Sequence, residues 1–537
     1  MTGPVVIVGS GFAGSILARL LVARGREVTL VERGRHPRFA LGESSTPLAA
    51  ICLERLAREH ALPDLADLAA YGRWGRRLPD LRRGLKRGFT FYAHRRGRRY
   101  RNDEGNSHRL LVAASPDEEI ADAHWMRSDV DAWLVDRAVR EGVEFLDRCD
   151  VTSIEGRPGA WTVRGGRDGR PLTLSADFVV DASGAGGFLE RSGRFPVAPG
   201  PPARLATGLL FGHFTDVPAF VAAAGATGAA FPAAPYPEER AAIHHLLDEG
   251  WMYVLPFDDG TVSAGVVVDR SHPDAARLLA AAPADAWREV VAAYPTLADQ
   301  FVDARPVDEI RGVDHLQRRA GRAAGEGWAL LPHTYSFLSP MLSTGIAWSL
   351  LGVERLARIL DPGVSAPERR RGLARYEALL DLETGAIAAL VEPAYRLRAD
   401  FDRFAAWTHL YFASASWAET RQRLVDAPGP GGWSDTGFLG ADDPVLRDAV
   451  VGATAELVEG RQRGGAPADR DTALETVARL IAPRNVAGLA DPRRNRAYPV
   501  DLDALVGAHA VLGIAREDLV ASLPRLRRSL TPFEPAG

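Results

Sequence analysis

The alternation of apolar and polar positions in the first residues predicts a strand, a turn and a helix, in that order. Residues 5–8 are a short β-branched run, and residues 12–23 repeat apolar side chains at helical spacing. A second apolar run at 28–31 ends at Glu32. Strand, helix and strand in this order are typical of the parallel sheet of a nucleotide-binding domain.

Later segments continue the same pattern. Residues 129–140 have the apolar spacing of a helix face, and the run 143–146 predicts a strand after it. A third apolar strand, 178–180, leads into the glycine-containing turn 181–184, which favours a return to the first sheet. The segments between these strands then supply a second sheet. From Leu373 onward the patterns are nearly all helical.

A glycine-rich turn lies between the first strand and the first helix. It reads Gly9-Ser10-Gly11-Phe12-Ala13-Gly14, and Glu32 closes the second strand. Glycines in this position permit a tight turn and a close approach of pyrophosphate, the helix N-terminus binds phosphate, and the acid accepts from ribose hydroxyls. The sequence therefore predicts a dinucleotide site, with a non-binding glycine turn as the less favoured alternative.

Composition excludes several classes of protein. The 537 residues are 46% hydrophobic and 25% charged with a net charge of −4, which is typical of a globular protein and gives no attraction to nucleic acid or anionic membranes. The two cysteines, Cys52 and Cys149, are too few for a disulfide framework or a cysteine metal site. No segment has the pattern of a membrane span or an export signal, so we expect a cytoplasmic protein without a metal.

The chain contains one lysine, Lys86, among 65 basic residues. An amine loses a proton or forms N-linked adducts, whereas a guanidinium stays charged and planar. A single lysine retained among so many arginines indicates a chemical role for Lys86, with chance survival as the alternative. Lys86 precedes the run 88–92, which predicts a strand, and a lysine at a strand entry can point into a cavity between domains.

Several motifs together resemble one family. Besides the glycine turn and Glu32, they are Gly42 to Pro47, Lys86 to Phe91, Trp251 to Pro256 and Pro340 to Gly345. Over roughly residues 1 to 420 the chain resembles the flavin-dependent halogenases, within the FAD monooxygenases of the glutathione-reductase type. The resemblance implies an α/β protein with a Rossmann-like FAD-binding domain, an inserted mixed β-sheet substrate domain and a mainly helical C-terminal region. The boundaries that we expect are 1–50, 104–190 and 320–372 for the first, 51–103 and 191–319 for the second, and 373–537 for the third.

The resemblance also implies an activity and its partners. Such an enzyme uses reduced FAD, dioxygen and chloride or bromide to halogenate an electron-rich, aromatic small molecule, which is free or carrier-bound. Only one dinucleotide fingerprint is visible, so a separate flavin reductase is expected to supply FADH2. The alternative is an FAD monooxygenase or oxidase of the same fold without halide chemistry.

Site residues follow from the same resemblance. In that family a lysine like Lys86 receives hypohalous acid, and aromatics like Trp251 and Tyr253 separate the flavin from the substrate; an ordinary buried strand is the alternative for these two. The turn Ser343, Thr344 and Gly345 is similar to the one that holds halide, because a helix N-terminus binds anions, although an ordinary helix start is the alternative. The predicted cofactor contacts are Gly9, Gly11, Phe12, Ala13, Gly14, Glu32, Arg33, Ser44, Ser45, Arg127, Gly345 and Ile346. For Ser44 and Ser45, capping of the apolar run 48–56 is a further interpretation.

Three positions depart from the family pattern. Pro332-His333 and Ser339-Pro340 stand where related flavoproteins carry acids, and Leu342 replaces the glutamate that the tryptophan-halogenase subgroup has before its Ser-Thr-Gly turn. Acid–base assistance to a substrate must therefore come from another part of the chain, and indole is not implied.

Overall fold

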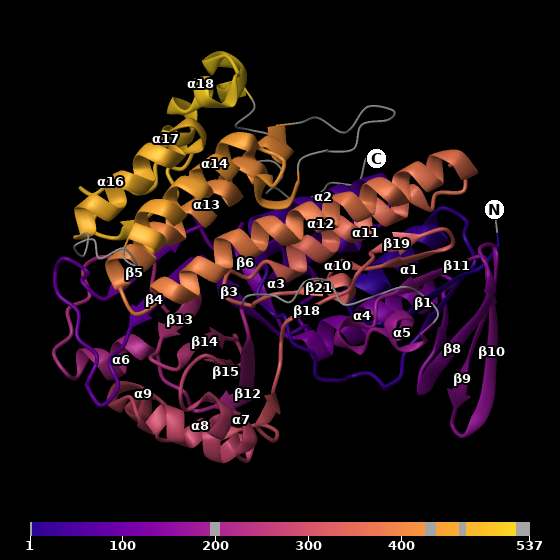
Figure 1. Cartoon of the computed structure of the whole chain (residues 1–537), viewed down its shortest axis with the longest axis horizontal. Coiled ribbons are helices and arrows are strands. Elements are labelled where there is room, and N and C mark those ends of the chain that lie inside the picture. Colours follow the sequence, from indigo (N-terminus) through magenta and orange to yellow (C-terminus); the bar gives the residue numbers. More distant parts are fainter. Residues whose placement is uncertain (1–2, 194–204, 425–436, 461–468, 522–537) are drawn as a thin grey trace.

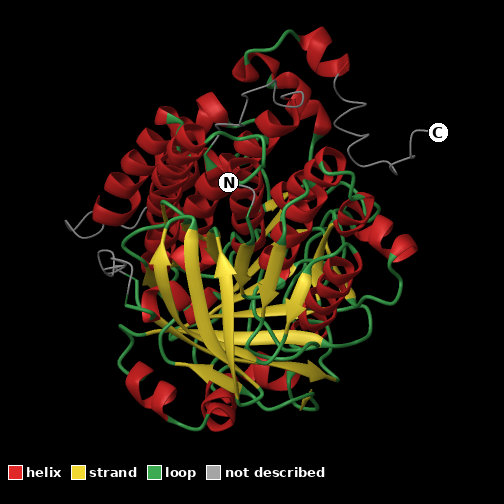
Figure 2. Ribbon diagram, turned by 90° about the vertical axis from the view of Figure 1, so that its right-hand side faces the viewer, coloured by secondary structure: helices red, strands yellow, loops and turns green. Residues whose placement is uncertain are grey.

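The computed structural model describes residues 3–193, 205–424, 437–460 and 469–521. Two β-sheets lie side by side, and long helices cross above both of them (Figure 1). Turning the molecule by a quarter shows the strands gathered in the lower half and most helices above them (Figure 2). The mixed α/β architecture with a helical C-terminal region agrees with the predicted fold class.

The first sheet carries the nucleotide-binding pattern. Its central strands are parallel and their residues are buried, which explains their continuous apolar sequence. The predicted strands at 5–8, 28–31, 143–146 and 178–180 all belong to it. In spatial order the strands are β19 (Ala324–Gly325), β20 (Trp328–Leu330), β11 (Phe178–Asp181), β1 (Val5–Val8), β2 (Val28–Val31) and β7 (Glu144–Leu146).

Three helices pack together beside this sheet. Helix α1 (Phe12–Ala23) contacts α4 (Arg127–Arg140) and α11 (Gly345–Ile359). A small antiparallel sheet extends from the connection between β7 and β11. It consists of β8 (Cys149–Arg157), β9 (Ala160–Arg167) and β10 (Arg170–Ala176).

The second sheet is mixed and presents two different faces. Helices α7, α8 and α9 lie below this sheet (Figure 1). Alternate residues of its central strands, such as Met252 and Val254, pack in the cluster that these helices share, while Trp251 and Tyr253 belong to the core on the other face. Its strands in order are β16 (Arg305–Pro306), β12 (Thr207–Thr215), β15 (Val262–Asp269), β14 (Gly250–Pro256), β13 (Ala242–Leu246), β4 (Gly88–Ala93), β5 (Arg109–Ala113) and β22 (Ala497–Tyr498), with β17 (Arg311–Val313) also paired to β12. The helices are α7 (Ala275–Ala280), α8 (Pro283–Ala292) and α9 (Pro295–Gln300).

Two strands of this sheet lie outside the segments predicted for it. β5 falls in the part 104–190 that was expected to bind FAD. It nevertheless pairs antiparallel with β4, the strand that precedes it in the chain. β22 comes from the expected helical region and pairs parallel with β5. β5 extends the sheet beyond β4, and β22 then pairs with the open edge of β5 and becomes the outer strand.

The C-terminal helices cover the face of the sheet that carries Trp251. Phe404 and Phe412 of α13 meet Phe91 and Phe89 of β4 edge-on, so the aromatic positions of this helix belong to the core. The helices are α12 (Ala366–Leu397), α13 (Phe401–Leu424), α14 (Pro444–Ala453), α16 (Arg470–Ile481), α17 (Leu502–Gly507) and α18 (His509–Leu512). Within the described ranges, none of the helices has the length and apolar character that a membrane span requires.

Shorter elements complete the chain. β3 and β6 form a separate antiparallel pair that matters for the site below. The remaining elements are α2 (Pro47–Glu59), α3 (Tyr71–Arg77), β3 (Arg83–Lys86), β6 (Asp122–Trp125), α5 (Phe188–Arg191), α6 (Phe220–Gly225), β18 (Arg318–Arg319), α10 (Pro332–Tyr335) and β21 (Ser336–Phe337).

Candidate active site

A cavity of about 690 Å³ runs from the ends of the first sheet to the second sheet. Its size is in the range of small-molecule and cofactor sites. It brings together most of the site residues predicted from the sequence, whereas Ser45 and Lys86 do not line it. Those that line it are Gly9, Gly11, Phe12, Ala13, Gly14, Glu32, Arg33, Ser44, Arg127, Trp251, Tyr253, Ser343, Thr344, Gly345 and Ile346.

The glycine turn has a tight backbone. Gly9 has a φ of +111°, and a Cβ placed on it would lie 2.4 Å from the carbonyl oxygen of Ala182. A Cβ on Gly14 would lie 2.1 Å from the carbonyl oxygen of Gly9. The start of α1 therefore lies directly against the turn that follows β1, as a dinucleotide cradle requires.

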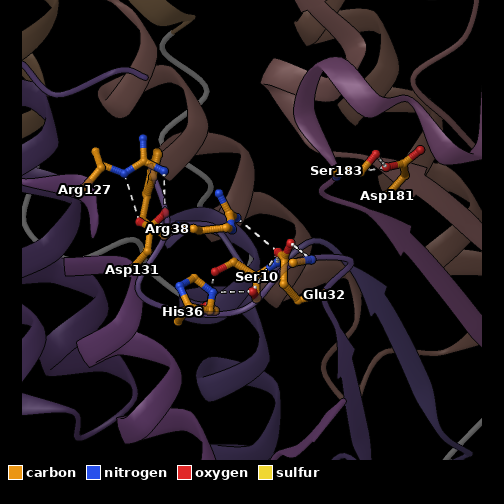
Figure 3. A network of polar contacts seen from close by, with 11 residues as sticks. Ser10, Glu32, His36, Arg38, Arg127, Asp131, Asp181 and Ser183 are labelled. Atoms are coloured by element: carbon orange, nitrogen blue, oxygen red, sulfur yellow. Dashed lines mark hydrogen bonds and ion pairs between the residues drawn. The ribbon is translucent and has the colours of Figure 1, made fainter. Parts of the chain in front are cut away.

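Glu32 lies at the end of β2, facing the cavity (Figure 3). Its carboxylate accepts from Ser10 N at 3.2 Å, from Ser10 Oγ at 2.9 Å and from Arg38 Nη2 at 3.1 Å. Burial alone would raise its pKa, but Arg38 and the N–H groups of Gly34 and Ser10 hold the pKa of Glu32 below its usual range. Glu32 is therefore an ionised acceptor, which suits ribose hydroxyls.

Arg127, at the start of α4, pairs with Asp131 of the same helix (Figure 3). Its Nε and Nη2 donate to Asp131 at 2.9 Å each, and its Nη1 donates to the carbonyl of Leu41 at 2.7 Å. Asp131 also accepts from Phe12 N at the start of α1, at 3.1 Å. The guanidinium faces the cavity, but these bonds make it chiefly a clamp between α1, α4 and the segment after β2.

The turn before α11 has a strained start. Ser343 has a φ of +52°, which is uncommon for a non-glycine residue, and its N–H donates to Pro340 O at 3.1 Å. The N–H group of Ser343 is therefore already bonded within the turn. The N–H groups of Thr344 and Gly345 have no acceptor among the described residues, and α11 begins at Gly345. They lie at the positive end of the helix dipole, where a helix can bind an anion.

Two predicted motifs meet at this turn. Ser343 Oγ donates to Ser44 Oγ at 3.2 Å, which links the segment before α2 to the start of α11. Ser45 Oγ instead donates to Ala123 O at 2.8 Å. Neither serine caps α2, whose N-cap is Thr46 without a side-chain bond. The capping interpretation of these serines is therefore wrong.

Two residues that depart from the family pattern, His333 and Ser339, contact the turn before α11. The imidazole of His333 packs on Gly345, where a Cβ would lie 2.5 Å from the ring. Burial lowers the pKa of His333 to about 4, so the ring is uncharged at the start of α11. Ser339 Oγ lies 2.9 Å from Tyr395 Oη and accepts from Met341 N at 3.2 Å. Both side chains shape the turn without adding negative charge.

Trp251 and Tyr253 form one wall of the cavity. Trp251 is fully buried and its Nε1 donates to Tyr395 Oη at 2.7 Å, which ties it through Ser339 to the turn before α11. Tyr253 lies over Gly265 of the neighbouring strand, where a Cβ would lie 2.5 Å from the tyrosine ring. The ring of Tyr253 therefore occupies space that is free because Gly265 has no side chain.

Lys86 lies behind this wall. It is fully buried at the end of β3, its Nζ donates to Ser45 O at 2.6 Å, and it lies 4.0 Å from the ring centre of Phe89. The ring of His244 lies between, stacked on Phe89 at 5.9 Å and on Trp251 at 5.2 Å between ring centres. We expected Lys86 to point into a cavity. In the structure it instead lies in a closed site next to the stacked rings of Phe89, His244 and Trp251.

Sequence reasoning did not find several residues of this site. Asp131, His244 and Tyr395 each act through contacts with segments far away in the chain, and no local motif marks them. The same holds for Asp122 and Glu419, two acids whose charges act on Lys86.

Comparison with known proteins agrees with this geometry. A curated relative, tetracycline 7-halogenase of Kitasatospora aureofaciens, is 29% identical over 350 residues, which cover 64% of this chain and 60% of the relative. Monodechloroaminopyrrolnitrin halogenase PrnC of Pseudomonas fluorescens is 24% identical over 389 residues, or 70% of this chain and 65% of the relative. The match thus spans less than two thirds of either relative.

A solved structure has the same fold over nearly the whole chain. The crystal structure of halogenase PltM with phloroglucinol and FAD superposes with a TM-score of 0.81 at 21% identity, covering 93% of this chain and 100% of that one. The family model for FAD dependent oxidoreductases matches residues 4–328. With the glycine cradle and Glu32 facing one cavity, the chain belongs to the FAD-dependent oxidoreductase family.

Proposed function

We propose that the protein is an FADH2-dependent halogenase that acts on an electron-rich, aromatic small molecule. The observation that carries this proposal is the position of the chain's only lysine. Lys86 is buried behind the stack of Trp251 and His244, outside the cavity that suits FAD. A monooxygenase needs its substrate at the flavin, whereas a lysine behind an aromatic wall suits an oxidant that leaves the flavin.

The residues of the cavity fit the cofactor. Gly9 and Gly14 allow the close backbone packing of the turn after β1 and the start of α1 that a pyrophosphate cradle requires, and ionised Glu32 suits a ribose. When bound, reduced FAD supplies the oxidising equivalent from dioxygen that halide chemistry needs. The N–H groups of Thr344 and Gly345 attract the halide, and the uncharged His333 beside them adds no competing negative charge.

The aromatic wall and Lys86 have separate tasks. Trp251 and Tyr253 keep the substrate away from the flavin, so that freed hypohalous acid is the species that reaches it. The amine of Lys86 receives the hypohalous acid and directs the halogen to a carbon of the aromatic ring. The named activities of the two curated relatives, both halogenases, support this assignment.

Turnover with a separate reductase tests the proposal. We expect that the protein, a flavin reductase, NADH, bromide and phloroglucinol together give brominated product, detected by its mass. NADPH alone is not expected to reduce bound FAD at the rate of turnover, because no second dinucleotide fingerprint is present. Rapid bleaching of the flavin by NADPH alone would instead favour the monooxygenase alternative.

A substitution of Trp251 tests the wall. We expect Trp251→Phe to fold and to lose about 1 kcal/mol of stability, since it keeps a ring but loses the bond to Tyr395. No hydroxylated product should form, because the remaining rings still separate flavin and substrate. The matched control is Trp287→Phe in helix α8, which packs against the opposite face of the same sheet. Hydroxylation in good yield by both the wild-type protein and Trp251→Phe would mean that substrate reaches the flavin and that Trp251 is ordinary core.

A further inference from the structure

Two tyrosines of the C-terminal helices bond to the turn before α11, residues 339–344. Tyr411 of α13 donates from its hydroxyl to the carbonyl of Leu342 at 2.7 Å. The hydroxyl of Tyr395, on α12, lies 2.9 Å from Ser339 Oγ. The turn is therefore anchored at two separate positions, and each anchor comes from a different helix of the C-terminal region.

Tyr395 also contacts the wall of the cavity. Its Oη accepts from Trp251 Nε1 at 2.7 Å. An indole nitrogen only donates, so the hydroxyl proton of Tyr395 is still available for Ser339 Oγ. Ser339 Oγ accepts in addition from Met341 N at 3.2 Å. One continuous chain of hydrogen bonds therefore runs from Trp251 on the second sheet to the backbone of the turn.

Water has little access to either anchor. Tyr395, Tyr411, Ser339 and Leu342 are all buried. A buried donor or acceptor that loses its partner has no water to replace it, so such a bond costs more to leave unmade than an exposed one. The two tyrosines therefore restrict the turn more strongly than hydroxyl groups at the surface would.

The conformation of the turn requires support from outside it. Ser343 has a φ of +52°, and a non-glycine residue keeps such a conformation only where its surroundings fix it. Leu342, which directly precedes Ser343, is the residue that Tyr411 holds. Directly after Ser343 come the N–H groups of Thr344 and Gly345, which have no acceptor among the described residues. The anchors therefore lie next to the two donors that are available for an anion.

We propose that Tyr395 and Tyr411 are positioning residues for the halide. They fix the turn before α11 in the conformation that leaves the N–H groups of Thr344 and Gly345 free to donate to an anion in the cavity. Both tyrosines lie outside the described lining of the cavity, so they act through the turn and not by touching the halide. This role rests on the proposed function, because it assigns the two N–H groups to the halide that the reaction consumes.

Removal of a single hydroxyl group tests the proposal, and the chain offers a closely matched control. Tyr411→Phe deletes the bond to the carbonyl of Leu342. Tyr376 is a second buried tyrosine, on α12, and it donates to the backbone carbonyl of Leu330 at the same 2.7 Å, away from the turn. Tyr376→Phe and Tyr411→Phe should therefore lose similar stability in unfolding experiments, while only Tyr411→Phe alters the turn.

Bromide affinity is the property that should separate these variants. Bromide is titrated into the FAD-bound protein without reductant, and its binding is followed by flavin absorbance, because Thr344 and Gly345 line the cavity that suits FAD. We expect Tyr411→Phe and Tyr395→Phe each to weaken bromide binding by about tenfold, and Tyr376→Phe to leave it nearly unchanged. In turnover by Tyr411→Phe, the KM for bromide should rise by the same factor, while kcat at saturating bromide stays close to that of the wild type.

The outcomes separate this proposal from the proposed function. The positioning role is overturned if the wild type binds no bromide, if both Tyr395→Phe and Tyr411→Phe bind it as the wild type does, or if Tyr376→Phe loses as much affinity as they do. Halogenated product together with any of these results leaves the proposed function standing. A protein that forms no halogenated product, but in which only Tyr395→Phe and Tyr411→Phe weaken bromide binding, contradicts the proposed function and supports the positioning role.

Discussion

Lys86→Met is expected to lower halogenated product by at least about 1000-fold while FAD binding and dioxygen consumption continue. Methionine has a similar length and no polar head, so it suits a site that is 0% exposed. It lacks the amine that receives the halogen, and hypohalous acid then escapes. Product mass, flavin absorbance and a soluble trap for hypohalous acid measure the three effects.

Because Lys86 is fully buried, Lys86→Met is a clearer test of its role than Lys86→Arg. At an exposed strand entry, Lys86→Arg would preserve charge at little cost. In the closed site beside Phe89 and Ser45, the larger guanidinium costs about 1–3 kcal/mol by overpacking, so loss of product by Lys86→Arg would be ambiguous. Lys86→Met leaves the Ser45 carbonyl unpartnered, at about 1–3 kcal/mol, and unfolding experiments measure that separately.

Arg83→Met is the matched control for Lys86→Met. Arg83 lies on the same strand but is half-buried and pairs with Asp258 at 3.5 Å. Its replacement should leave product yield nearly unchanged, because a surface ion pair contributes little. Normal product formation by Lys86→Met would remove Lys86 from the reaction and with it the main support for a halogenase over a monooxygenase.

The sequence alone was sufficient to predict those parts of the site whose conformation depends on residues close together in the chain. The strand, glycine turn and helix at residues 5–23 and the acid Glu32 could be predicted, because each feature depends on neighbours within a few positions. The start of α11 at Gly345 was also predictable from the apolar run that follows it. In both places the local sequence determines the conformation.

Contacts between distant segments could not be predicted. Trp251 binds Tyr395, and Lys86 lies opposite Asp122; neither partner belongs to a motif, and their pairing depends on how β14 meets α12 and how β3 meets β6. The positive φ of Ser343 was not predicted either, because no glycine marks that position. Composition gave one long-range clue, the single lysine, but not its burial.

Gly14→Ala is expected to weaken FAD binding by at least about 100-fold, or about 2.7 kcal/mol. The new Cβ would lie 2.1 Å from the carbonyl oxygen of Gly9, a backbone atom that cannot rotate away, so α1 must move out from the glycine turn. That movement widens the cradle in which the pyrophosphate would lie. Titration of the apoprotein with FAD, followed by flavin fluorescence, measures the loss.

Gly385→Ala provides the opposite expectation for the same substitution in a helix. Gly385 is an exposed residue of α12, and a Cβ there meets no atom within 4 Å. Alanine at an exposed helix position should raise stability by about 1 kcal/mol and leave FAD affinity unchanged. Gly14→Ala makes the same replacement in a helix. A loss of FAD affinity that Gly14→Ala shows and Gly385→Ala does not is therefore caused by the collision of the new Cβ with Gly9. Equal FAD affinities for the two variants would mean that the start of α1 does not carry the cofactor.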